Sequence, residues 1–299
     1  MSAHFGIDIG GTKIEGVVVD AAAPAASLVR MRKPTDHSLG YESILAAVSE
    51  VVEELRKQSG CSPSAIGIGH PGVVDPRTNR MKNSNTVSLN GRELRNDLQA
   101  LLKVPLVLAN DANCFTLAEA RFGAARNAQS VFGVIMGTGV GGGIVVDRRV
   151  FGGCQGIAGE WGHNELIPGG PGCYCGRLGC VETVISGPAL ERYYRERSGR
   201  TLPLEMIAER AERASDVHAE ETIERLTQYF GKALSMVVNI LDPEYIVLGG
   251  GVSNIKALYR QGITELSKHV FNDRLGTTVV QNSLGDSAGV FGAAMLTMN

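Results

Sequence analysis

One histidine and three cysteines lie within eighteen residues of this chain, at the spacing H-x9-C-x-C-x4-C. These residues are His163, Cys173, Cys175 and Cys180. An imidazole and three thiolates form a complete tetrahedral ligand set for Zn²⁺. Because protein side chains fill all four positions, none stays open for water, and the predicted zinc is structural.

A disulfide between Cys173 and Cys175 is the alternative, but a C-x-C bridge closes a strained ring. The N-terminus also lacks a basic segment followed by an apolar one, and no run reaches the length of a membrane span. We therefore expect thiols or metal ligands in a cytoplasmic protein. The other cysteines are expected to be buried apolar residues: Cys61, Cys114 and Cys154.

A glycine-rich turn near the N-terminus has the composition of a phosphate-binding loop. Its residues are Asp8, Gly10, Gly11, Thr12 and Lys13. Glycines let backbone N–H groups reach phosphate oxygens, Thr12 can donate a hydroxyl, and Lys13 adds a positive charge. Asp8 is placed to hold Mg²⁺ through water.

Two further glycine clusters follow apolar runs: Gly137, Thr138 and Gly139, and then Gly249, Gly250 and Gly251. The second of these follows a buried strand, at the edge where α/β sheets bind ligands. Any one cluster could be a tight turn only. The three together favour a nucleotide held between two half-domains, although neither a Walker-A nor a Rossmann fingerprint is present.

Carboxylates and amides that suit a polyhydroxyl substrate follow in the sequence. The strand 105–110 ends at Asn110 and Asp111, where a carboxylate can take the proton of an attacking hydroxyl. The alternative that these residues only cap the next helix stays open. Further groups for sugar hydroxyls are Asn83, Asn85, Glu160, His163 and Glu182.

The elements that must position these residues are duplicated. Residues 6–20 and 133–147 repeat each other at an offset of 127, each as an apolar strand, a glycine turn and a second strand. Repetition at that distance indicates a duplicated domain. The periodicity predicts helices over 41–58, 112–123, 222–241 and 288–298, and strands over 65–69, 105–110 and 245–248.

These elements predict two α/β domains around a cleft. The predicted bounds are 1–110, joined by the C-terminal helix 288–299, and 111–287, which contains the zinc loop 160–182. A length of 299 residues fits about two domains. The net charge of −2 gives no electrostatic basis for binding nucleic acid or an anionic membrane.

Several motifs together resemble the ROK family of repressors, open reading frames and kinases. They are DIGGTK (8–13), NDAN (110–113), MGTGVGGG (136–143), GEWGH (159–163), CYCGRLGCVE (173–182) and VLGGG (247–251). The resemblance implies a duplicated actin-like, hexokinase-type (ribonuclease-H-like) fold that binds ATP, Mg²⁺ and a hexose. It also implies a homodimer and the same four zinc ligands.

The resemblance also implies individual roles. Asp111 is the catalytic base and Asn110 contacts the sugar, while Glu160, His163 and Glu182 bind sugar hydroxyls. The turns at 8–13 and 137–139 hold phosphates, and 249–251 borders the adenosine. His70, Pro71, Gly72 and Ala109 vary from patterns in some relatives, so they leave the pocket floor undefined.

Within the family, KNSNTVSLNG, EWGHN and CYCGRLGCVETVISGP resemble bacterial fructokinases of the mannokinase type. This predicts phosphorylation of the 6-hydroxyl of fructose, with mannose and glucose as further acceptors. The alternatives are an N-acetylglucosamine or glucose kinase of the same family, and a non-catalytic sugar-sensing regulator. Family regulators carry an N-terminal helix-turn-helix, for which a first strand that begins near Phe5 leaves no room.

Overall fold

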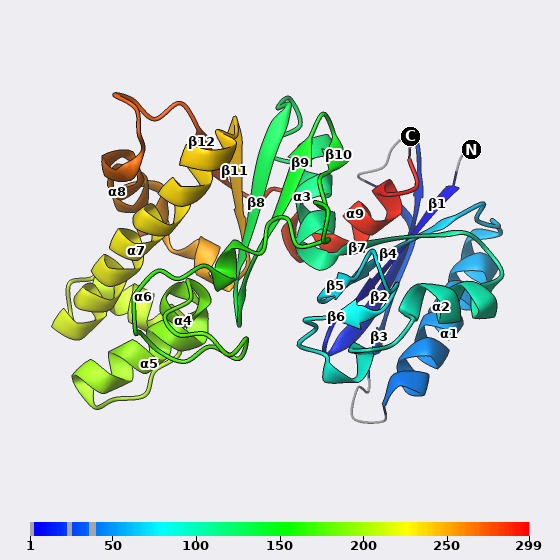
Figure 1. Cartoon of the computed structure of the whole chain (residues 1–299), viewed down its shortest axis with the longest axis horizontal. Coiled ribbons are helices and arrows are strands. Elements are labelled where there is room, and N and C mark those ends of the chain that lie inside the picture. Colours follow the sequence, from blue (N-terminus) through cyan, green and yellow to red (C-terminus); the bar gives the residue numbers. More distant parts are fainter. Residues whose placement is uncertain (1–2, 23–25, 36–39, 299) are drawn as a thin grey trace. The chain divides into compact units, whose positions relative to one another are not determined.

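The computed structural model describes residues 3–22, 26–35 and 40–298, and the chain divides into two compact units (Figure 1). Unit 1 consists of Met1–Asn127, Gly143–Ala158 and Ser283–Asn299, and unit 2 of Ala128–Gly142 and Gly159–Asn282. Residues 1–2, 23–25 and 36–39 of the predicted first domain, and residue 299 of the predicted C-terminal helix, lie outside the described residues.

The bounds of the units differ from the predicted domains at Gly143–Ala158, which lies in unit 1, and at helix α3 (Asp111–Arg121). This helix belongs to unit 1 because it packs against the C-terminal helix α9 (Ala288–Met295), which also lies in unit 1. The predicted domain boundary at the end of the preceding strand therefore separates α3 from α9, the helix against which it packs.

Each half of the predicted repeat forms a five-stranded mixed sheet. The first sheet has the order β3-β2-β1-β4-β7, with bounds Ser27–Pro34, Lys13–Asp20, Ala3–Ile9, Ile66–His70 and Leu106–Asn110. The second has the order β10-β9-β8-β11-β12, with bounds Arg149–Val150, Val140–Val146, Ser130–Met136, Tyr245–Gly249 and Thr278–Gln281. In both, two parallel pairings follow the first strand of the repeat, which supports duplication.

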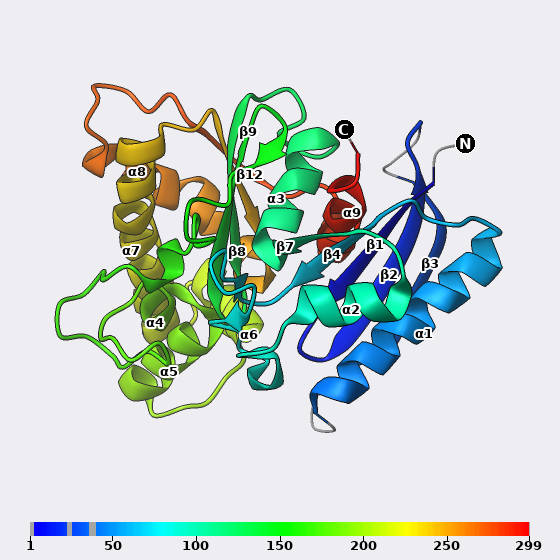
Figure 2. The same ribbon diagram turned by 45° about the vertical axis from the view of Figure 1, so that its right-hand side comes forward.

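Helices cover both faces of the first sheet (Figure 2). On one face, α1 (Tyr41–Ser59) and α2 (Leu94–Leu102) bury their apolar residues with the strand residues in one core. On the other face, Val290 and Ala294 of α9 pack against Val17 and Val19. The sheet is therefore buried on both sides, which holds the strand ends, and the loops that follow them, in fixed positions.

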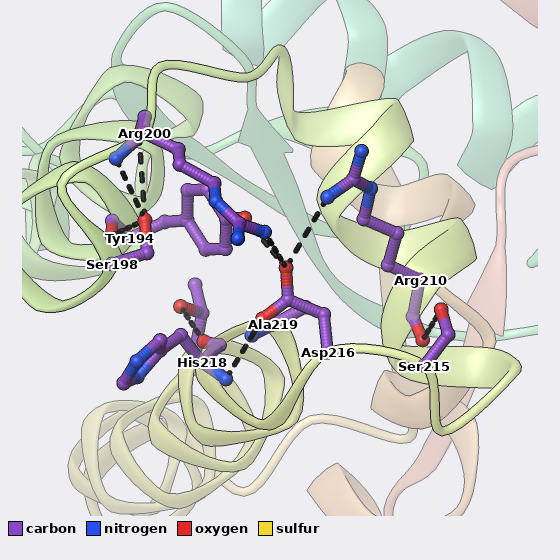
Figure 3. A network of polar contacts seen from close by, with 9 residues as sticks. Tyr194, Ser198, Arg200, Arg210, Ser215, Asp216, His218 and Ala219 are labelled. Atoms are coloured by element: carbon purple, nitrogen blue, oxygen red, sulfur yellow. Dashed lines mark hydrogen bonds and ion pairs between the residues drawn. The ribbon is translucent and has the colours of Figure 1, made fainter.

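In unit 2, α7 (Val217–Leu241) and α8 (Gln261–His269) pack against each other beside β11 and β12 (Figure 1). Figure 3 shows the start of α7, where Asp216 accepts hydrogen bonds from the N–H groups of His218 and Ala219. The same carboxylate accepts from Tyr194 Oη at 2.7 Å and from Arg210 at 3.4 Å. This one capping residue therefore joins α5 (Gly187–Ser198) and α6 (Leu204–Glu212) to α7.

The remaining elements are short. They are β5 (Val73–Val74), β6 (Met81–Lys82), α4 (Glu182–Ile185) and the 3₁₀ turns η2 (Val87–Leu89), η3 (Trp161–His163), η4 (Gly251–Asn254), η5 (Lys256–Tyr259) and η6 (Gly285–Ser287). Within the described part of the chain, none of the helices has the length and apolar character needed to cross a bilayer.

Candidate functional site

The four predicted metal ligands come together in unit 2. The ligand atoms of His163, Cys173, Cys175 and Cys180 all lie within 4.8 Å of one another. Short antiparallel bridges, Glu165 to Cys180 and Gly172 to Leu178, fold the loop back on itself and bring its two ends together. Cys180 is fully buried, whereas Cys175 is exposed.

Two of the distances within this cluster match the edges of a zinc tetrahedron. The Sγ atoms of Cys175 and Cys180 are 3.7 Å apart, and Cys173 Sγ lies 3.5 Å from His163 Nδ1. With Zn–S near 2.3 Å and Zn–N near 2.05 Å, a tetrahedron has edges of about 3.8 Å between sulfurs and about 3.5 Å between sulfur and nitrogen. Thiol–thiol hydrogen bonds alone do not require this arrangement, so the donor set and its spacing favour the metal.

The second nitrogen of His163 is directed to Tyr174. His163 Nε2 lies 3.1 Å from Tyr174 Oη, and the two rings meet edge to face. An outer partner of this kind fixes which nitrogen of a ligating imidazole faces the metal. His163 can therefore contact a sugar hydroxyl directly only where Tyr174 shares or yields Nε2.

The first predicted phosphate turn lies in unit 1, between β1 and β2. Gly10 N–H donates to Lys13 O at 2.9 Å, and the buried Thr35 donates its hydroxyl to Gly10 O at 2.7 Å. The Lys13 ammonium is paired with the buried Glu15 at 3.2 Å. The lysine that we expected to face phosphate is therefore held beside the turn by a carboxylate.

Two other predicted nucleotide loops lie together in unit 2, because β8 and β11 are parallel neighbours. The turn 137–139 follows β8, and residues 249–251 begin at the last residue of β11. Gly250 has φ +81°, and a side chain there would clash with the backbone of Met136. Glycine is therefore required at this position, where one loop is packed directly on the other.

Asp8 and Asp111 are neighbouring carboxylates in unit 1. Asp8 Oδ1 is buried and has no hydrogen-bond partner among the described residues. Burial, and after it the charge of Asp111, raises the pKa of Asp8 to about 7. A buried, unpaired carboxylate oxygen beside a second carboxylate is the donor chemistry that Mg²⁺ takes, so these residues fit the predicted metal.

Asn110 takes the helix-capping role that the sequence analysis weighed against a contact with the substrate. Asn110 Oδ1 accepts the N–H of Ala112 at 2.9 Å, which makes Asn110 the N-cap of α3. Its Nδ2 donates to Gly72 O at 3.1 Å, so both ends of its amide are engaged. Asp111 accepts the same Ala112 N–H at 2.8 Å, and desolvation raises the pKa of its carboxyl. The raised pKa suits a general base.

A pocket of about 340 Å³ lies within unit 1 beside Asn110. Sequence reasoning placed His70 at an undefined pocket floor but assigned no role to Asn113, Val150 or Arg95, which also line this pocket. Among the described residues, Arg95 Nε is buried without a hydrogen-bond partner. The sequence analysis did not predict helix α2, which carries Arg95, and it assigned Arg95 no role.

The other predicted sugar residues divide between the units. Asn85 is exposed in unit 1, on a loop that Asn90 holds through two hydrogen bonds with the backbone of Ser84, each 2.9 Å long. Glu160 and Glu182 lie in unit 2, on either side of the cysteine cluster. Glu182 Oε2 accepts the N–H of Val140 at 3.0 Å, which connects the cluster's flank to the second predicted phosphate turn.

Known proteins match this chain over its whole length. A model of the ROK family matches residues 4–299. The N-acetyl-D-glucosamine kinase of Photobacterium profundum is 33% identical over 306 residues, which cover 99% of this chain and 99% of that protein.

Solved structures agree with this match. The ROK hexokinase from Thermus thermophilus is 33% identical with a TM-score of 0.88, and the match covers 98% of this chain and 97% of that one. The ROK family glucokinase from Streptomyces griseus, in complex with glucose and AMPPNP, is 30% identical with a TM-score of 0.81 and 98% coverage of both. The predicted α/β fold of the actin-like, hexokinase type is confirmed, whereas the finer prediction of a fructokinase is not.

Proposed function

Since this chain belongs to the ROK family and is an ATP-dependent sugar kinase, we propose that it phosphorylates the 6-hydroxyl of N-acetyl-D-glucosamine. The observation that carries the choice of sugar is the match to an N-acetyl-D-glucosamine kinase over 99% of both chains. This replaces fructose as the first candidate, and the alternative that we weighed from the sequence becomes the main one.

The pocket in unit 1 supports an acceptor with an acyl substituent. Val73, Val74 and Val150 give the pocket an apolar wall, and Arg95 supplies a cationic donor. A methyl group suits the valines, and a carbonyl oxygen suits the guanidinium. Burial lowers the pKa of His70 to about 4, so His70 adds no competing positive charge at neutral pH.

Fructose remains the second candidate because a specific stretch favours it. Residues 82–91 and 173–188 resemble those of mannokinase-type fructokinases. Neither fructose nor mannose has an acyl group to fill the pocket beside Asn110. Binding of N-acetylglucosamine should therefore depend on Arg95 more strongly than binding of fructose.

The residues of this chain supply the acid–base chemistry and the positioning of the substrates. Asp111 takes the proton of the 6-hydroxyl as that oxygen attacks the γ-phosphorus of ATP, and the raised pKa of its carboxyl favours this transfer. Asn110 orients the sugar, and the turns at 8–13 and 137–139 hold the phosphates. Asp8 would hold Mg²⁺, which would neutralise charge on the phosphates.

The cysteine cluster has a structural role in this proposal. His163, Cys173, Cys175 and Cys180 would hold a zinc ion, and the flanking residues Glu160 and Glu182 would bind sugar hydroxyls. The spacing of the ligand atoms supports the metal. A homodimer and the adenosine contact of residues 249–251 stay predictions.

Initial rates with ATP and Mg²⁺ on N-acetylglucosamine, glucose, mannose and fructose test the proposal. We expect the highest kcat/KM for N-acetylglucosamine, and a higher value for fructose would refute this choice of sugar. Asp111→Asn should lower kcat by at least about 10³-fold while sugar binding stays measurable. A wild type that produces ADP with none of these sugars would refute the catalytic assignment of the site.

Arg95→Leu tests the role of the pocket. If Arg95 binds the acyl carbonyl, KM for N-acetylglucosamine should rise about tenfold, while KM for glucose changes by less than about twofold. Arg92→Leu is the matched control, because Arg92 lies over the ring of Tyr41 and does not line the pocket. An equal rise in KM for both sugars would contradict the acyl contact.

A further inference from the structure

Residues 161–187, which contain the cysteine cluster, also form hydrogen bonds with residues on both sides of the turn 137–139. Gly187 N–H donates to Gly137 O at 2.8 Å, and Trp161 Nε1 donates to Gly141 O at 3.1 Å. Between these two points, Val140 N–H donates to Glu182 Oε2 at 3.0 Å. Three hydrogen bonds from residues 161–187 therefore hold both sides of this turn.

The Glu182 carboxylate lies between the cluster and the turn. Its Oε1 is 3.9 Å from Cys173 Sγ, and its Oε2 accepts from Val140. A side chain at Gly139 would place its Cβ 2.5 Å from the same Oε2. The carboxylate therefore packs directly against the turn, and glycine at 139 gives it room.

The position of Glu182 depends on the cluster. Glu182 begins α4 two residues after the buried Cys180, and Val181 N–H donates to Asn164 O at 3.0 Å, next to His163. The residue before Glu182 is therefore held at two places. It is bonded covalently to the ligand Cys180, and it is hydrogen-bonded to the residue that follows the ligand His163. A metal that bonds His163 to Cys180 would hold these ends together far more strongly than the sulfur contacts of 3.5 to 3.9 Å that connect them.

We propose that Glu182 is a positioning residue through which the metal-bound cluster fixes the turn 137–139, so that metal occupancy sets the affinity for the nucleotide. The proposal rests on the phosphate-binding role given to this turn under the proposed function. A turn that is held before binding does not have to be ordered when phosphate arrives, so losing the metal weakens nucleotide binding. This role is additional to the sugar contacts that the proposed function assigns to Glu160, His163 and Glu182.

Calorimetric titration with MgAMPPNP, in the absence of any sugar, measures the effect directly. We expect Kd to rise about tenfold when the metal is removed by a chelator, and about tenfold in Glu182→Ala with metal bound. Because both changes act through one contact, removing the metal from Glu182→Ala should raise Kd by less than about twofold more. Hydrogen exchange in peptides covering 136–146 should become faster in both cases.

Glu182→Gln is the matched control, because its amide oxygen can still accept the Val140 N–H. We expect its Kd for MgAMPPNP to stay within about threefold of wild type. Thr138→Val tests the turn itself and should weaken nucleotide binding with the metal still bound. No effect of Thr138→Val would show that the turn does not hold phosphate and would overturn this inference together with that part of the proposed function.

Other outcomes overturn the inference alone. One is a metal-free protein that keeps its thermal unfolding transition and binds MgAMPPNP with unchanged Kd. Another is that metal removal and Glu182→Ala each raise Kd for MgAMPPNP, and that both together raise it by the product of the two factors. If the metal-free protein does not stay folded, Glu182→Ala and Glu182→Gln are compared at full metal occupancy. The coupling would be refuted if both variants bound MgAMPPNP with the wild-type Kd.

Discussion

Replacing Asp8 by Asn should change how the stability of this kinase depends on pH. The Asp8 carboxylate lies close to two glycine backbones, and a methyl group at Gly289 would lie 3.1 Å from its Oδ2. Its pKa is raised to about 7, first by burial and then by the charge of Asp111. The unfolded chain binds the same proton with a pKa of about 3.9, so the folded state holds it more tightly.

The direction of the effect follows from the raised pKa. Between pH 4 and 7 the folded protein keeps a proton on Asp8 that the unfolded chain has released. The free energy of unfolding therefore falls as pH rises through this window, and levels off above pH 7. The full difference corresponds to about 4 kcal/mol, of which about 2 to 3 kcal/mol falls between pH 5 and 8.

Urea unfolding followed by circular dichroism, without Mg²⁺, at pH 5, 6, 7 and 8 measures this slope. Asp8→Asn carries no titrating group at that position, so its stability should fall by about 2 to 3 kcal/mol less than wild type across this range. The amide leaves an unpaired buried group at every pH, which shifts the curve but not its slope. Mg²⁺ should stabilise wild type more than the variant at pH 8, and Asp8→Asn should be inactive. Parallel pH curves for the two proteins would refute the reasoning.

Three further changes test how the surrounding structure is held. Glu119→Ala should destabilise unit 1 by about 2 to 4 kcal/mol in urea unfolding, because the buried Glu119 accepts N–H groups at the turn that begins at Ser283, and a result under about 1 kcal/mol would contradict this. Gly139→Ala should displace Glu182 and raise KM for ATP about tenfold, whereas unchanged steady-state kinetics would show that the turn adapts. Gly250→Ala should lower the thermal unfolding temperature by several degrees because it combines a left-handed φ of +81° with a clash against β8, and an unchanged temperature would argue against that packing.

Local patterns were enough to predict several of the elements that carry the site. The apolar spacing of residues 41–58 predicted α1 within one residue, and the prediction of 245–248 matches β11. The match between 6–20 and 133–147 predicted the duplication that appears as two sheets of the same strand order. These features depend on side-chain periodicity and glycine placement, which neighbouring residues in the chain specify.

For other elements, the sequence pattern was a weaker guide to where they begin and to which unit they belong. The predicted helix over 222–241 begins five residues late, because the capping role of Asp216 depends on where Tyr194 and Arg210 lie in space. The assignment of α3 to unit 1 likewise depends on packing against α9, which follows it by more than 160 residues in the chain. A boundary placed at a strand end takes no account of that partner.

The sequence by itself determined which ligands the cysteine cluster offers, because residue type and loop spacing decide what metal chemistry four side chains can perform. It also determined the family and the fold class, through motifs spread along the whole chain. Only the tertiary structure decided that Glu182 touches the turn 137–139, that Lys13 is paired with Glu15, and that Arg95 lines a pocket beside Asn110. Each of these contacts joins side chains to partners whose direction in space is set by packing, and not by any local pattern in the chain.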